Sequence, residues 1–186
     1  MSLTLVTPPA AEPVTLSEAK AHLKVDTTAD DTLITSLIVA ARARGEWHTG
    51  RAFVTQSWTL WLDAWPQSGL IEIPLPPIQS VTQVRVYALD DTPSVLDPSV
   101  YQVDAASAPA RLTGKIDFAP PTNLRAVNAV EIAFTAGYGG ASAVPQPVKQ
   151  AILQIAADLY ANRGDEAEIV SSAAQALLAP YRVFKL

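Results

Sequence analysis

Apolar residues recur with helical spacing near both ends of the chain. Early on, "TLSE" is a capping box, with Thr15 as the N-cap and Glu18 three residues later, and it predicts a short helix to about Leu23. A longer helix is predicted next, ending at Gly50. Its apolar stripe consists of Leu33, Ile34, Leu37, Ile38 and Ala41. A further helix with its own apolar stripe is predicted after Pro145.

Between these helices the spacing of apolar residues changes from the helical period of 3.6 residues to the strand period of 2 residues. The segment "FVTQSWTLWLDAW" alternates in this way and predicts a long strand, with Trp58 on one face and Trp61 on the other. Five further segments read as short strands, giving about six in all: "GLIEIPL", "SVTQVRVYALD", "SVYQVDA", "ARLTGKIDF" and "NAVEIAFTAG". Their regular spacing favours an antiparallel sheet or a small sandwich.

The predicted fold class is therefore α+β, with an antiparallel β insertion between helical ends. Residues 15–50 and 145–179 form the helical core, and residues 51–144 form the insertion. The early and late helices are expected to pack together, because neither apolar stripe can be buried alone. Residues 1–14 are expected to be an extended arm without regular structure, since three prolines lie there, and residues 180–186 a C-terminal tail.

Composition and charge narrow the function. The 186 residues contain no cysteine, which excludes disulfides, thiol catalysis and cysteine-ligated metals. The net charge of -5 argues against a protein that grips nucleic acid through a broad basic surface. The N-terminal segment does not read as a signal peptide, and the apolar run "LITSLIVAARA" is too short to span a bilayer. We expect a protein made in a reducing cytoplasm, with no membrane contact.

The glycines of "FTAGYGG" raise the question of a phosphate site, because they lie between a strand and a helix. Gly137, Gly139 and Gly140 match neither the Walker pattern nor the dinucleotide-binding pattern. Prolines also remove backbone donors where an anion would need them. We therefore predict a turn with positive φ angles. His22 and His48 have no metal-ligating partners at recognisable spacing, so we expect no metal, no cofactor and no enzyme activity.

Two features predict binding to other proteins. Four tryptophans, at positions 47, 58, 61 and 65, cluster in sequence, and tryptophan is enriched at protein interfaces. At the other end, the segment "SSAAQALLAPYRVFKL" is predicted to form a short helix broken by Pro180, followed by an apolar and basic tail. No obvious core is available to this tail, and chain ends fray unless they are tied down.

Several segments, in order, resemble the head–tail connector (adaptor) proteins of tailed bacteriophages, prophages and gene transfer agents. The most specific are "TGRAF" with "QSW", "FTAGYG", "LYANRG" and the terminal "PYR", and the resemblance runs from about Leu16 to Val183. Members of this family form a ring, typically of twelve subunits, beneath the portal of a DNA-filled capsid. The β insertion resembles the larger subgroup of this family.

The resemblance implies a structural protein of the virion neck, assembled in the cytoplasm of the bacterial host. Its partners would be other copies of itself, the portal and a stopper or other tail-side neck protein, while DNA passes through the lumen without sequence-specific binding. The helical ends would build the ring, and the C-terminal segment would dock on the portal. The residues expected to bind the portal are Leu177, Leu178, Pro180, Tyr181, Arg182, Val183, Phe184, Lys185 and Leu186. Those expected at subunit or neck interfaces are Trp47, Trp61, Trp65 and Tyr138.

Two alternatives stay open at this point. The protein could be another neck or tail component, such as a stopper or tail-completion protein, although those are mostly β while this chain devotes both ends to helices. It could also be an enzyme with a site on the β insertion, but no catalytic motif supports that reading.

Overall fold

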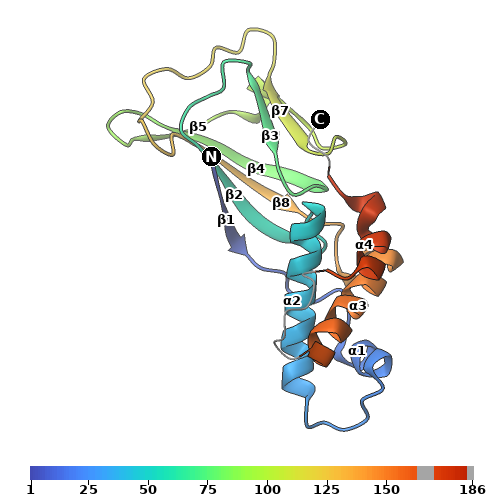
Figure 1. The fold of residues 1–186 in the computed structure, drawn as a ribbon. Coiled ribbons are helices and arrows are strands. Elements are labelled where there is room, and N and C mark those ends of the chain that lie inside the picture. The colour runs from blue at the N-terminus through green and yellow to red at the C-terminus, as the bar shows by residue number, and fades with distance from the viewer. Residues whose placement is uncertain (163–169, 184–186) are drawn as a thin grey trace. The chain divides into compact units, whose positions relative to one another are not determined.

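The structure is a computed structural model that describes residues 1–162 and 170–183 (Figure 1). Their contacts divide the described chain into two compact units. A β unit contains residues 1–8 and 55–137, and a helical unit contains residues 9–54, 138–162 and 170–183. The chain therefore passes from one unit to the other three times. The mixed α+β class predicted from the sequence is confirmed.

The helical unit is built from the two ends of the chain. Its helices are α1 (Leu16–Leu23), α2 (Asp31–Thr49), α3 (Gln146–Asn162) and α4 (Ser172–Leu178), with 3-10 turns η2 (Ala141–Ala143) and η3 (Ala179–Tyr181). The predicted capping box is present, because the Thr15 hydroxyl accepts from the Glu18 amide and the Glu18 carboxylate accepts from the Thr15 amide. Helix α2 ends at Gly50, which has a φ of 68° in the left-handed region.

One hydrophobic core joins these helices. Ile34, Ile38 and Ala41 of α2 and the apolar stripe of α3 are buried in it, as the sequence pattern predicted. Phe53 is fully buried in the same core, and a Cβ atom added to Gly45 would lie 2.9 Å from its ring. Gly45 therefore lets this ring approach the backbone of α2 closely. The expected packing of the early helices on the late ones is confirmed.

The β unit contains two antiparallel sheets. The five-stranded sheet has the order β1 (Ser2–Thr7), β2 (Gln56–Leu62), β8 (Val130–Ala136), β4 (Ile78–Tyr87), β5 (Pro93–Val95). The three-stranded sheet has the order β3 (Leu70–Ile73), β7 (Ala110–Gly114), β6 (Tyr101–Asp104), and the 3-10 turn η1 (Pro98–Val100) precedes β6. Buried residues alternate along β8, so that one face of the larger sheet is apolar.

Two strands differ from the sequence-based expectation. Residues 2–7 were expected to lack regular structure, but they form β1, which pairs with β2 along most of its length. Pro8 and Pro9 come directly after this strand and so remove no donor from its ladder. Strand β5 was not predicted at all, because its three residues are too few to show a period.

Candidate functional site

The glycine-rich loop after β8 is a structural turn. Gly137 and Gly139 have φ angles of 117° and 133°, whereas Gly140 has an ordinary negative φ, so the predicted turn is confirmed at two of the three glycines. The Tyr138 amide donates to the Phe53 carbonyl at 3.1 Å, within the helical unit. The loop thus places the Tyr138 side chain near the residues that follow α2.

The end of α2 also holds the C-terminal segment. The Val183 amide donates to the carbonyl of Thr49, the last residue of α2, at 2.8 Å. The Arg51 guanidinium donates through Nε to the Tyr181 carbonyl at 2.5 Å. These two bonds join residues about 130 positions apart in the chain and bracket residues 181–183. We call the groups that make them, Thr49, Arg51, Tyr181 and Val183, the tail anchor.

The Tyr138 side chain lies close to Arg51 and Tyr181 of the tail anchor. Burial raises the pKa of its hydroxyl, and that effect is opposed by the nearby Arg51 guanidinium, which also hydrogen-bonds to it. Tyr181 acts on the same hydroxyl and raises its pKa further. Tyr138 is therefore a neutral, half-buried group close to Arg51 and Tyr181.

His48 lies on the last turn of α2, beside the same segment. Burial lowers its pKa below the usual value of 6.5, and the positive charge of Arg182 lowers it further. The imidazole is therefore neutral near pH 7. The Arg182 side chain is exposed at this point of the surface.

The residues predicted to bind the portal fall into three groups. Leu178 is fully buried, and Leu177 and Tyr181 pack against the same helical core, so the expectation that the tail has no core to join is wrong at Tyr181. The physical reason is that α4 and η3 continue the packing of α3. Pro180 and Arg182 are exposed, whereas Val183 is half-buried. Phe184, Lys185 and Leu186 lie outside the described residues.

The tryptophans have different environments. Trp47 is 76% exposed on α2, while Trp65 is buried and its ring centroid lies 5.1 Å from that of Phe118. Trp58 and Trp61 lie opposite Phe134 and Glu131 of β8, on opposite faces of the sheet as predicted. Trp61 is half-buried, with its centroid 6.1 Å from the Tyr87 ring. Of the three tryptophans expected at interfaces, only Trp47 is largely available to a partner.

Sequence reasoning did not single out Thr49 and Arg51 as functional residues. The available signal was Gly50, because a glycine that ends a helix also brings the following residues close to the helix terminus. The pairing with residues 181–183 has no signature in the sequence itself, since it depends on how α4 packs.

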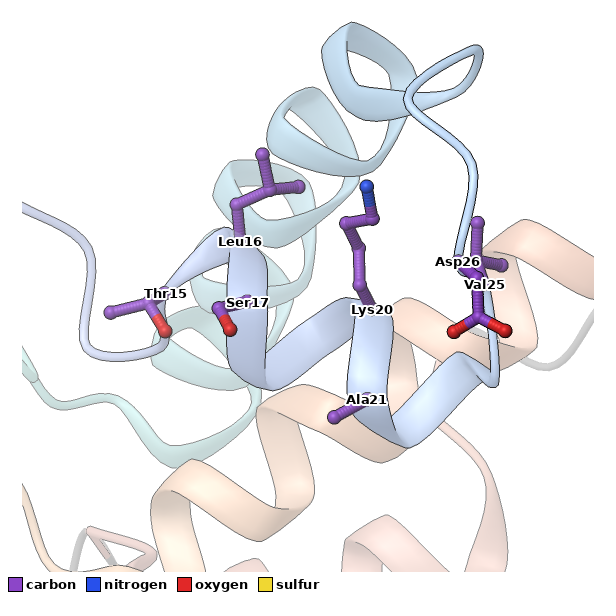
Figure 2. Close-up of a pocket in the computed structure, with 7 residues that line it drawn as sticks. All are labelled: Thr15, Leu16, Ser17, Lys20, Ala21, Val25 and Asp26. Atoms are coloured by element: carbon purple, nitrogen blue, oxygen red, sulfur yellow. The ribbon is translucent and has the colours of Figure 1, made fainter.

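An open groove runs beside α1 and the loop that follows it (Figure 2). In this view Leu16 and Lys20 extend from the same side of α1, and Val25 and Asp26 lie on the loop. The fold already uses its main polar groups: Lys20 forms an ion pair with Asp31 at 2.6 Å, and Thr15 caps the helix. We therefore assign no ligand to this groove.

Metal binding and membrane insertion have no support in the described part of the chain. Within residues 1–162 and 170–183, no group of three or more His, Asp or Glu residues could hold a metal ion. Among the helices that the structure describes, none is long and apolar enough to cross a membrane. The features that stand out are thus a tethered C-terminal segment and an exposed tryptophan, which suit contacts with other proteins.

Comparisons with known proteins also indicate a protein that makes contacts with other proteins. Residues 13–92 match the family of phage gp6-like head–tail connector proteins. A search of curated proteins finds no match.

Solved structures resemble the whole chain. A chain from the neck of an empty gene transfer agent particle, computed with C6 symmetry, superposes with a TM-score of 0.86 at 26% sequence identity, covering 100% of this chain and 97% of that one. A chain from the virion of a native gene transfer agent particle gives 0.84 at 27% identity, again covering 100% and 97%. A chain from the neck of the native particle, computed with C12 symmetry, gives 0.82 at 27% identity with the same coverage.

The family match covers α1, α2 and the strands that directly follow them. The structural likeness covers these elements and also α3 and α4. The resemblance inferred from the sequence is confirmed: residues 13–92 match the phage gp6-like head–tail connector family, and the chain as a whole has the fold of a chain from the gene transfer agent neck.

Proposed function

We propose that the protein is a structural head–tail connector, an adaptor in the neck of a phage-like particle. The observation that carries this proposal is the likeness over 100% of the chain to a chain of the gene transfer agent neck, at a TM-score of 0.86. The match of residues 13–92 to connector proteins supports it independently. The protein would be assembled in the host cytoplasm and would end in the virion.

The adaptor forms a ring of identical subunits in this proposal. Neck structures with C6 and C12 symmetry support a closed ring, and twelve subunits is the number we propose. The ring would extend the DNA channel below the portal and present its other side to a tail-side neck protein. The net charge of -5 suits a channel through which DNA slides without being held.

The C-terminal segment is the proposed portal-docking element. Arg182 and Pro180 are exposed, and residues 181–183 are held at a defined place by a backbone hydrogen bond to Thr49 and a side-chain hydrogen bond from Arg51. A tethered segment loses less conformational entropy on binding than a free one. Leu177, Leu178 and Tyr181 would support this element from inside the subunit, while the side chains beyond Val183 would meet the portal.

The first test is mass by light scattering of the purified protein, alone and mixed with its cognate portal, followed by electron microscopy. A ring stacked on the portal, with its symmetry, is expected. Failure to associate with the portal, together with binding to tail tubes, would instead favour the alternative of a stopper or tail-completion protein. Binding of a small molecule with turnover would favour an enzyme.

A truncation tests the docking segment directly. Deleting residues 181–186 should leave a folded protein that no longer sediments with portal rings. A second variant that lacks only residues 184–186 keeps the tail anchor and separates lost contacts from lost anchoring. Undiminished co-sedimentation of both variants with the portal contradicts a docking role for the tail.

A further inference from the structure

The outer face of α2 carries no charge. Ser36, Ala40, Ala43 and Trp47 lie on one stripe at helical spacing, opposite the buried stripe of Ile34, Ile38, Ala41 and Gly45. Beside this stripe, Leu33 and Val39 are 39% and 42% exposed. The exposed side of a surface helix normally carries charged residues. An uncharged stripe of small residues with one large aromatic is instead typical of a surface that packs against another helix.

Of the charged residues of α2, only Arg44 borders this stripe, and the others lie away from it. Asp31 pairs with Lys20 in the first turn, and Arg42 is buried in ion pairs with Glu12 and Glu46. Arg44 borders the stripe on one side. The absence of charge therefore concerns one specific face of α2.

Helix α3 has a comparable outer face. Its residues Gln150, Leu153, Ala157 and Ala161 form a stripe at helical spacing that is exposed or half-buried and bears no charge. Lys149 and Asp158 lie at its margins. The opposite side of the helix, with Val148, Ile152 and Ile155, is buried in the core.

Apart from Leu153, which packs against the edge of the core that α2 and α3 share, the residues of these two faces lie outside that core. The subunit therefore presents two different uncharged helix faces. A cyclic ring requires two different surfaces on each subunit, because each contact joins one surface of a copy to the other surface of the next. The large Trp47 side chain on α2 and the small Ala157 and Ala161 on α3 complement each other in size.

We infer that the outer face of α2 on one copy packs against the outer face of α3 on the next copy. The inference rests on the proposed ring-forming function and names the surfaces that close the ring. The occupant is a second copy of this chain, since the structures that resemble it over its whole length come from necks with six-fold and twelve-fold symmetry. Trp47 is the central anchor of this contact.

Cross-linking can test the pairing of these faces, because the chain has no cysteine of its own. The double variant Ala43→Cys with Ala157→Cys is treated with a short bismaleimide reagent, alone and in the presence of the cognate portal. A ladder of linked copies that extends beyond the dimer is expected. Each single variant is the matched control and should give no ladder, because a heterologous contact brings the two positions together only between different faces.

The outcomes separate the inference from the proposed function. Rings that are seen by electron microscopy but yield no ladder would overturn the inference and leave the connector function intact. Efficient dimers of the Ala43→Cys variant alone would also overturn it, because they would indicate a symmetric α2–α2 contact. If no ring forms with or without the portal, the proposed function fails and this inference fails with it.

A second measurement uses the exposed tryptophan. Trp47→Ala should lower the apparent affinity of ring assembly by at least about tenfold, as expected for the loss of a central interface tryptophan. Leu89→Ala is the matched control, because Leu89 is 71% exposed on the β unit and lies on neither face. Equal assembly of the two variants, with unchanged melting temperatures, would overturn the role of α2.

Discussion

Gly50 ends α2 in a backbone conformation that other residues adopt with strain. Its φ is 68°, and a Cβ added there would lie 3.6 Å from the Val183 side chain, an ordinary contact distance. The cost of Gly50→Ala should therefore come from the backbone and amount to about 1 kcal/mol of unfolding free energy. Denaturant unfolding of the wild type and the variant measures it.

Gly69→Ala is the matched control for this substitution. Gly69 has a similar φ of 72°, and a Cβ added there would meet no atom within 4 Å beyond its chain neighbours. The two variants should lose similar stability. A much larger loss at Gly50 would show that the added methyl group also disturbs the packing of Val183 beside the end of α2.

His48 should make stability depend on pH. Because burial and Arg182 depress its pKa in the folded protein, the unfolded chain binds the proton more tightly. The stabilisation is complete above the unfolded pKa of about 6.5 and is lost as the pH falls below it. Between about pH 7.5 and about pH 5.5, the wild type should lose more stability than His48→Gln. Parallel pH profiles of the two proteins would contradict this.

At the scale of elements, Arg42 joins α2 to the segment that precedes α1. Its guanidinium lies 2.7 Å from a Glu12 oxygen and 2.5 Å from a Glu46 oxygen, and it is 8% exposed. Arg42→Ala would leave these carboxylates without their cation and should cost about 3–5 kcal/mol of unfolding free energy. Thermal unfolding, followed by circular dichroism, measures the loss.

The ion pair of Arg111 with Asp104 provides the control. It joins β7 to β6 at a similar distance of 2.5 Å, but the Arg111 side chain is 51% exposed. Arg111→Ala should therefore change stability by less than about 1 kcal/mol. If both substitutions cost the same, burial would not be what distinguishes the two arginines.

The sequence predicted correctly those elements whose ends or spacing depend on neighbouring residues. The capping box at Thr15, the helix end at Gly50 and the alternation around Trp58 all depend on neighbouring residues, and the structure confirms them. Strand β1 carries too little signal, because both of its faces are largely exposed at the edge of the sheet and its register comes from β2. Strand pairing between distant segments is a tertiary effect that period alone does not encode.

The candidate site could be predicted only in part for the same reason. The sequence indicated that the C-terminal tail would bind a partner, and that role stays a prediction. It did not indicate that Leu178 is a core residue or that Arg51 holds the Tyr181 carbonyl, because these contacts depend on how the two chain ends pack together.

At the scale of the whole molecule, the β insertion leaves and re-enters the helical unit at adjacent points. The Phe53 carbonyl accepts from the Tyr138 amide at 3.1 Å, and in the β unit Gln56 lies opposite Ala136. A variant in which a short glycine–serine linker replaces residues 55–137 should therefore keep a cooperatively unfolding helical unit. Thermal unfolding without a cooperative transition, together with loss of the helical circular dichroism signal, would contradict this.

That single hydrogen bond has a consequence in chain entropy. Residues 55–137 form a very long loop with respect to the helices, yet the entropy of closing a loop grows only with the logarithm of its length. Exchanging this segment for one of about five residues changes the closure cost by only about 2–3 kcal/mol. The helical unit can therefore carry insertions of very different size between Phe53 and Tyr138 at nearly the same thermodynamic cost. The inserted segment is free to diverge in sequence and length while the helices stay unchanged.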